Sequence, residues 1–137
     1  MTSYTSINGR VPTTSDARTL AIELRGRSKF EGVVVTDYNE VGNLVTWHNV
    51  AATLCDGVVA TLRGDGVDLL MVPFNPEGVI DCVVEAVEKG TLKESDVDRK
   101  VERIGRLKEA GLRVKEQDTT ERLETEEQVD LAMESIT

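Results

Sequence analysis

The chain has 137 residues, which is enough for one compact domain but not for two ordinary ones. Hydrophobic residues make up 39% and charged residues 30% of it, so the composition predicts folding over most of its length. Its 16 basic and 25 acidic residues give a net charge of −9, which disfavours nucleic acid as a partner. The apolar runs are far shorter than the roughly 20 residues that cross a bilayer, so no membrane span is expected.

Residues 1–90 alternate strand-like and helix-like patterns, which predicts repeated β/α units around a parallel sheet. The first unit is a short strand over residues 1–7 and a helix over residues 16–25, with Ser15 as its N-cap. The second strand, residues 32–35, is the clearest, because it contains a continuous β-branched run. It ends at residues 36–39.

Two further units follow in the same order. Residues 48–62 have a helical apolar face, and residues 64–66 then turn the chain into a third strand, residues 67–72, which Pro73 closes. A third helix ends before Gly90, and its expected inward residues are Val79, Ile80, Val83, Val84 and Val87.

The next helix has Ser95 as its expected cap and an apolar stripe made by Val97, Val101, Ile104 and Leu107. Gly105 lies within this helix, which indicates either a close backbone approach or a weakened helix. Beyond Leu112 the apolar density falls, so residues 115–121 are predicted to be a linker and residues 125–136 an acidic amphipathic helix.

Three parallel units make an incomplete α/β fold, because a doubly wound sheet has about five or six strands and a (β/α)₈ barrel has eight. The open strand edges of such a piece would tend to pair with other segments.

Asp37 is the main candidate for chemistry, because reactive groups of parallel α/β folds gather just beyond the carboxyl ends of strands. A carboxylate that stays ionised there can act as a nucleophile. The alternative is a local role, in which Asp37 accepts a hydrogen bond from a following amide in an Asx-turn.

Other polar residues favour structural interpretations. His48 is the only histidine, and no Gly-x-Ser-x-Gly elbow accompanies it. Residues 64–66 are predicted to form a turn rather than a dinucleotide loop. Asp68 is expected either to point into a pocket or to pair with a lysine of a neighbouring layer. Cys55 and Cys82 are predicted to be buried thiols, and no metal site or cofactor is expected.

Several segments of the sequence resemble those of a known protein family. Residues 29–38, Lys-Phe-Glu-Gly-Val-Val-Val-Thr-Asp-Tyr, resemble the nucleophile segment of family 3 glycoside hydrolases, and Leu24-Arg25 match the pair that precedes it. Residues 3–9 with Pro12 resemble the family's Ser-Tyr-x-x-x-Asn-Gly strand and turn. Residues 66–71 and the closing helix, with Val101, Arg103, Ile104, Lys108, Gly111 and Leu112, are also similar. Lys29 stands where the family has glycine.

The resemblance implies a fold and a chemistry. The fold would be a partial (β/α)₈ TIM-type barrel of about three units plus C-terminal helices. Asp37 would be the nucleophile of a retaining β-glucosidase that acts on terminal β-D-glucosyl residues of β-glucosides or β-glucan oligosaccharides. Tyr4 and Tyr38 match family positions that contact the sugar. The family also suggests an extracellular or lysosomal parent.

The resemblance further implies that residues 1–114 are the C-terminal part of the barrel and residues 115–137 an acidic linker and helix leading toward a second domain. Such a chain would need the other barrel strands and that domain, which carries the second carboxyl, so alone it would be inactive. Two alternatives remain open: a non-catalytic interaction module or pseudoenzyme fragment, and a small intact enzyme with Glu40 as the second catalytic group.

Overall fold

The computed structural model describes the backbone of residues 1–117 and the side chains of residues 1–112. The expected helix over residues 125–136 lies outside the described residues. The chain divides into two compact units, Met1–Leu107 and Lys108–Thr137. The first unit contains every candidate site residue. No described helix is long and apolar enough to cross a membrane.

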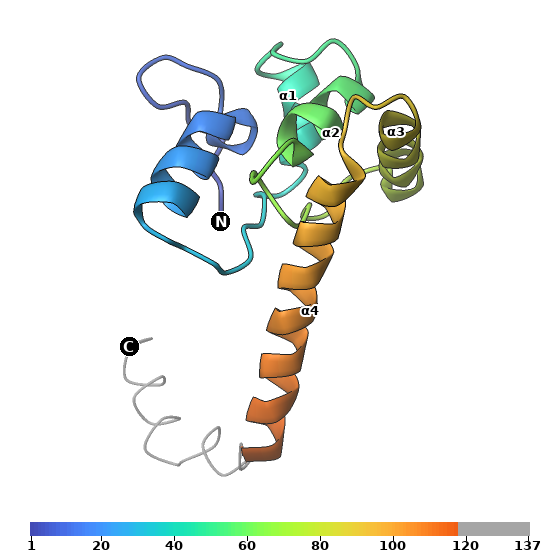
Figure 1. The fold of residues 1–137 in the computed structure, drawn as a ribbon. Coiled ribbons are helices and arrows are strands. Elements are labelled where there is room, and N and C mark those ends of the chain that lie inside the picture. Colours follow the sequence, from blue (N-terminus) through green and yellow to red (C-terminus); the bar gives the residue numbers. More distant parts are fainter. Residues whose placement is uncertain (118–137) are drawn as a thin grey trace, which may run out of the picture. The chain divides into compact units, whose positions relative to one another are not determined.

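Helices dominate the described residues (Figure 1). In chain order they are the 3₁₀-helix η1 (Thr13–Ser15), the π-helix η2 (Thr19–Arg27), and the α-helices α1 (Glu40–Thr46), α2 (Leu54–Leu62), α3 (Pro76–Glu88) and α4 (Glu94–Gln117). The part of α4 from residue 108 onward belongs to the second unit.

The expectation of regular parallel strands is not confirmed among the described residues. Segments 33–36 and 67–71 are extended and run parallel, but they share only one bridge, between Val35 and Leu69. Asp68 N–H donates to Val34 O (2.8 Å), and Thr36 N–H donates to Leu69 O (3.0 Å). Beyond these bonds, side chains take the positions of ladder partners: the Asp68 carboxylate accepts the Val34 N–H, and the Thr36 hydroxyl accepts the Met71 N–H. The pairing therefore stops after one bridge.

The first predicted strand, residues 1–7, is also irregular. Thr2 N–H donates to Val35 O (2.8 Å), which brings the N-terminus beside segment 33–36. Ser6 and Pro12 form an isolated antiparallel bridge across the intervening turn. Three extended segments thus adjoin one another, in the order that the sequence pattern predicted, without forming a regular sheet.

The predicted helix over residues 48–62 is wrong at its start. The structure has the short helix α1, which the sequence analysis missed, and α2 begins only at Leu54 after a capping box made by Thr53 and Asp56. Asn49 has a positive φ of 50° between the two helices, and Val50 is exposed. The left-handed backbone at Asn49 interrupts the helical path that the apolar spacing suggested.

Two predicted caps are also wrong. The Asp16 carboxylate, rather than Ser15, accepts the N–H groups of Arg18 and Thr19 before η2. Ser95 lies within the first turn of α4, which begins at Glu94. The start of α3 is capped by Asn75, whose side chain accepts the Gly78 N–H. Short polar side chains compete closely at helix starts, so a neighbour one to three residues away can take the role.

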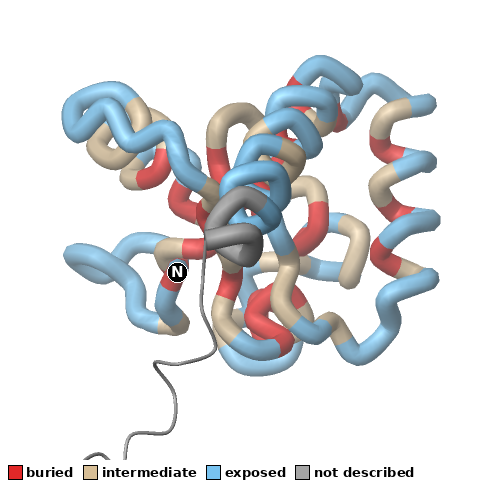
Figure 2. The backbone as a smooth tube through the Cα atoms, turned by 90° about the horizontal axis from the view of Figure 1, so that it is seen from below, coloured by how far each residue is buried: buried red, intermediate tan, exposed pale blue. Residues whose placement is uncertain are grey.

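The core consists of two clusters. Figure 2 shows how the buried residues are distributed along the backbone. One lies among α1, α2, α3 and the turn before α4, and its buried residues are Val41, Val58, Leu62, Val79, Cys82, Ala86 and Leu92. The other packs η2 against the extended segments through Leu20, Val34 and Val67. The nucleophile-like segment 33–36 is therefore held on one side by η2.

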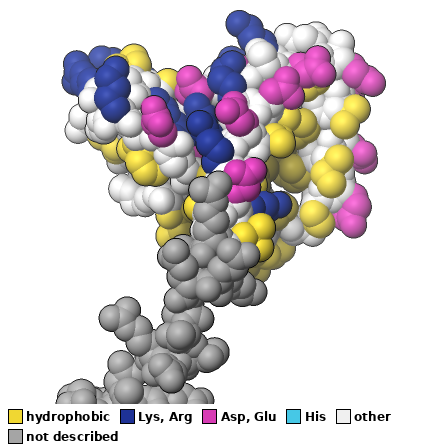
Figure 3. Space-filling model, turned by 60° about the horizontal axis from the view of Figure 1, so that its bottom comes forward, with side chains coloured by type: hydrophobic (Ala, Val, Ile, Leu, Met, Phe, Trp, Pro, Cys, Tyr) yellow, Lys and Arg dark blue, Asp and Glu magenta, His cyan; other side chains and the backbone are white. Residues whose placement is uncertain are grey.

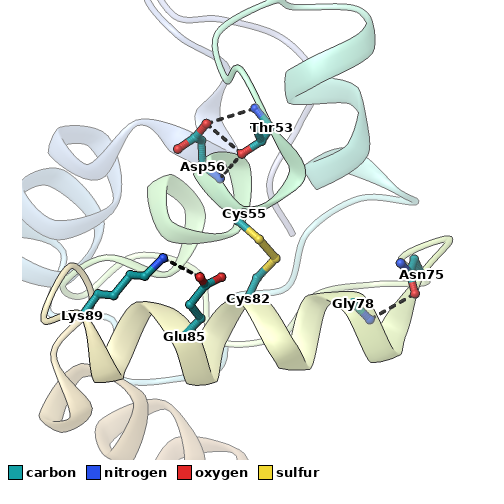
Figure 4. The surroundings of a disulfide bond; sticks show 8 residues. All are labelled: Thr53, Cys55, Asp56, Asn75, Gly78, Cys82, Glu85 and Lys89. Carbon is teal, nitrogen blue, oxygen red and sulfur yellow. Dashed lines mark hydrogen bonds and ion pairs between the residues drawn. A yellow bond between two sulfur atoms is a disulfide. The ribbon is translucent and has the colours of Figure 1, made fainter.

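Cys55 and Cys82 form a disulfide between α2 and α3, so the prediction of two buried thiols is wrong (Figure 4). Their Cα atoms are 5.0 Å apart, because the apolar faces of α2 and α3 pack against each other. Each cysteine lies within an apolar helical pattern, and that pattern alone does not distinguish a thiol that packs from one that pairs.

Part of the predicted apolar face of the last two helices is exposed. Ile80 and Val84 on α3, and Val101 and Leu107 on α4, are each more than half exposed, although all four were expected to face inward. Figure 3 shows hydrophobic side chains gathered on this face of the molecule. The groove between the helices is open and has a volume of about 240 Å³. Gly105 has open space where a Cβ would lie, which answers the earlier alternative: its helix is weakened without any close backbone approach.

Candidate functional site

Asp37 follows directly after the extended segment 33–36, at its carboxyl end, and its side chain is half-buried. Its own N–H donates to Oε2 of Glu40 (3.0 Å), and its Oδ1 accepts the N–H of Tyr38 (2.7 Å). The second contact is the kind of local turn contact that the non-catalytic interpretation anticipated. It engages one oxygen of the carboxylate. The backbone at Asp37 is therefore fixed on both sides.

Tyr4 lies beside Asp37, although 33 positions separate them in sequence. Its hydroxyl donates to Tyr38 O (2.6 Å) across the turn that carries Asp37. Desolvation raises the pKa of Tyr4 above its usual value, and the negative charges of Asp37 and Glu40 raise it further. The structure thus brings together all three residues that the sequence analysis singled out for sugar chemistry.

Two aromatic residues that the sequence analysis did not assign to the site extend it. The Trp47 ring lies 6.1 Å from the Tyr4 ring, and the Phe74 ring meets the Tyr38 ring edge-on at 5.9 Å. Trp47, Phe74 and Tyr38 are exposed. Phe74 follows the third extended segment, so the rule that located Asp37 beyond a strand could also have located Phe74.

The turns that carry Asp37 and Phe74 are tied together. Asn39 N–H donates to Met71 O (3.2 Å), and Asn39 Oδ1 accepts the Phe74 N–H (3.4 Å). Asn39 has a φ of 44°, which asparagine tolerates, whereas Val72 has a φ of 42°, which is strained for a β-branched residue. Strained backbone of this kind collects at functional sites.

Glu40 lies close to Asp37 and is completely buried. Its Oε2 also accepts the hydroxyl of Thr2 (2.8 Å). A carboxylate enclosed in this way has no access to a substrate, so the geometry argues against Glu40 as a second catalytic group.

At the ends of the extended segments that lie away from Asp37, ion pairs join these segments to the helices. Asp68 Oδ2 accepts the Val34 N–H (2.7 Å) and pairs with Arg25 (2.6 Å), while its Oδ1 pairs with Arg103 (2.9 Å). The structural interpretation of Asp68 is confirmed, with arginines in place of the expected lysine. Arg103 also pairs with Asp65 (2.8 Å), which lowers the pKa of Asp65.

Residues 64–66 form a turn in which Gly64 has a φ of 61°, as predicted. His48 is half-buried beyond the end of α1. Among the described residues, no group of histidine, cysteine and carboxylate side chains is arranged to hold a metal ion.

Comparison with known proteins finds similarity to glycosidases. A family model described as "Glycosyl hydrolase family 3 N terminal domain" matches residues 1–107. A lysosomal beta glucosidase of Dictyostelium discoideum is 38% identical over 104 residues, which cover 76% of this chain and 12% of that protein. An uncharacterized secreted glycosyl hydrolase of Arthroderma benhamiae is 30% identical over 108 residues, 76% of this chain and 29% of that protein.

Solved structures that are similar to this chain include β-glucosidases. A β-glucosidase from Erythrobacter marinus is 34% identical to this chain, with a TM-score of 0.64. The match covers 74% of this chain and 13% of the Erythrobacter chain. A β-glucosidase from Listeria innocua is 26% identical to this chain, with a TM-score of 0.70. The match covers 78% of this chain and 14% of the Listeria chain. These neighbours have TIM-barrel-like domains, and this chain spans a small fraction of their length.

Proposed function

This chain belongs to glycosyl hydrolase family 3, whose N-terminal domain it matches over residues 1–107, and from that premise we propose that Asp37 is the nucleophile of a retaining β-glucosidase. The observation that carries the proposal is the position of Asp37, half-buried at the carboxyl end of an extended segment and beside Tyr4 and Tyr38. Tyr4 and Tyr38 would contact the sugar.

The substrate class is a terminal β-D-glucosyl residue. Solved structures of the Listeria innocua β-glucosidase include a complex with glucose and, for a mutant, a complex with laminaribiose. In this chain the Asp37 carboxylate would attack the anomeric carbon, expel the aglycone oxygen and form a covalent glycosyl-enzyme, which water then hydrolyses. A second carboxyl about 5–5.5 Å from the first must protonate the leaving oxygen and later activate the water.

The second carboxyl would come from outside the span that this chain shares with its relatives. The chain covers 12% of the Dictyostelium protein and 13% of the Erythrobacter protein. Glu40, the nearest carboxylate in sequence, is enclosed in the core. The disulfide supports an oxidising compartment, because such bonds persist in secreted and luminal proteins and are rare in the cytosol.

A chimera tests the role of Asp37. Residues 1–107 of this chain would replace the matching segment of the Listeria innocua β-glucosidase, and aryl β-glucoside hydrolysis would be measured. We expect Asp37→Asn to lower kcat by at least about a thousandfold, because the covalent step is lost. Asp81→Asn, on the exposed part of α3, is the matched control and should leave kcat unchanged.

A mechanism-based label identifies the attacked residue directly. When the chimera is treated with a 2-deoxy-2-fluoro-glucoside, the fluoroglucosyl group should accumulate on the peptide that contains residue 37. Mass spectrometry would detect this labelled peptide. Hydrolysis that survives in the Asp37→Asn chimera, or a label on another peptide, would refute the proposal.

A further inference from the structure

Glu40 is a buried charged group that the proposed glucosidase chemistry does not use. It begins α1, three residues after Asp37, and none of its surface is exposed. Enclosing a carboxylate is costly unless hydrogen-bond donors compensate for the lost water. The donors that Glu40 receives therefore indicate what its burial achieves.

The donors come from the candidate nucleophile and from the N-terminus. Oε2 of Glu40 accepts the backbone N–H of Asp37 (3.0 Å) and the hydroxyl of Thr2 (2.8 Å). The Thr2 hydroxyl is also 2.6 Å from the hydroxyl of Thr14, in η1. Oε1 of Glu40 is buried and has no hydrogen-bond partner. One carboxylate oxygen thus joins the Asp37 turn to two segments that precede it in the chain.

We propose that Glu40 is a positioning residue for the reaction, whose carboxylate holds the backbone amide of Asp37 and thereby fixes the nucleophile beside Tyr4. This inference rests on the proposed role of Asp37. The Asp37 N–H donates to Glu40, and the Asp37 Oδ1 accepts the Tyr38 N–H. Asp37 therefore has little freedom to rotate away from Tyr4. Charge-assisted hydrogen bonds of this kind are stronger than neutral ones.

The ionisation of Tyr4 offers a second readout of this arrangement. Desolvation raises the pKa of Tyr4, and the negative charges of Asp37 and then Glu40 raise it further. A glutamate that merely filled the core away from Asp37 would leave the ionisation of Tyr4 unaffected. Glutamine retains the side-chain length and an oxygen acceptor but removes the charge, so Glu40→Gln separates the two effects.

The experiment uses the full chain and NMR. Amide hydrogen exchange at residue 37 would be compared in wild type, Glu40→Ala and Glu40→Gln, with the Ala86 amide of α3 as a reference for global opening. We expect Glu40→Ala to accelerate exchange at residue 37 about tenfold or more, and Glu40→Gln to keep it within about threefold of wild type. Glu77→Gln, which removes an exposed first-turn glutamate from α3, is the matched control.

Titration of the tyrosine ring carbons supplies the second readout. Glu40→Gln should lower the pKa of Tyr4, and Glu77→Gln should leave it unchanged. If Glu40→Ala unfolds, as the Ala86 amide would report, Glu40→Gln decides alone. Exchange at residue 37 that is fast in Glu40→Gln, or a Tyr4 titration identical to wild type, would overturn the proposal. The chimera assay of Asp37→Asn is independent of this result, so the two proposals can fail separately.

Discussion

Asp68 takes part in the pairing of the extended segments through its side chain as well as its backbone. Its carboxylate accepts the Val34 N–H and pairs with Arg25 and Arg103, which come from η2 and α4. The sequence analysis identified Asp68 as an unusual residue inside an apolar segment but named a lysine as its structural partner. Partners 43 and 35 positions away leave no local pattern, so a single sequence does not reveal them.

Lys29 gives a second example at this scale. It stands where the resemblance places a glycine, and its φ is 52°. The family glycine suits left-handed backbone, whereas lysine is strained there by about 1–3 kcal/mol. Sequence comparison identifies the substitution, but only the backbone angle shows that lysine is strained at this position.

Lys100 predicts a pH dependence of stability. It is buried on α4, and its Nζ donates to Gly64 O (2.8 Å). Burial lowers its pKa to about 8, against an ordinary value of 10.5, although nearby aspartates oppose the shift. Between these two values the unfolded chain binds the proton and the folded chain does not, so the free energy of unfolding rises with pH across this window, by at most about 3 kcal/mol.

Urea unfolding of wild type and Lys100→Met between pH 7.5 and pH 10 measures this effect. Tyrosines and other lysines titrate in both proteins, so the difference between the two curves isolates Lys100. We expect the wild type to gain stability relative to Lys100→Met as pH rises. Parallel curves would show that burial does not shift the ionisation of Lys100.

Among the elements, α3 was predicted and α1 was missed. Gly90 lies just beyond the end of α3, and the apolar spacing before it is helical, although Ile80 and Val84 are exposed rather than inward. The short α1 has only seven residues, so the apolar spacing of Val41, Leu44 and Val45 is brief, and the buried polar residues Glu40 and Asn43 interrupt it. The sequence analysis missed this helix because so short a stripe is a weak periodic signal.

The α2–α3 pair depends on the disulfide for part of its stability. The bond joins residues 27 positions apart, and closing a loop of that length removes conformational freedom from the unfolded chain worth about 3–4 kcal/mol. Cys55→Ser combined with Cys82→Ser should lower the free energy of unfolding by about this amount in urea. Wild type in a thiol reductant should match the double variant. Two titratable thiols in unreduced, unfolded wild type would contradict the prediction.

For the whole molecule, the sequence predicted the order of three extended segments and of four helices, η2, α2, α3 and α4, and the resemblance identified the family that the comparisons show. It did not predict the single-bridge pairing, because the hydrogen bonds that end it come from the Asp68 and Thr36 side chains. Nor did it predict the exposed groove between α3 and α4, because apolar periodicity indicates a face that can be buried without indicating what covers it.

The isolated 137-residue chain should not turn over aryl β-glucosides, even if Asp37 has the proposed role of nucleophile. Proton transfer to the leaving oxygen contributes a factor of about 10²–10⁴, and positioning of the sugar contributes more. Glu40 cannot supply the proton, because it is enclosed and bound to Thr2 and Asp37. The chimera, assayed at equal concentration, is the positive control. Turnover by the isolated chain that Asp37→Asn abolishes would mean that a second acid lies within these 137 residues. A stable dimer in size-exclusion chromatography, with a chimera that is also inactive, would favour a non-catalytic interaction module.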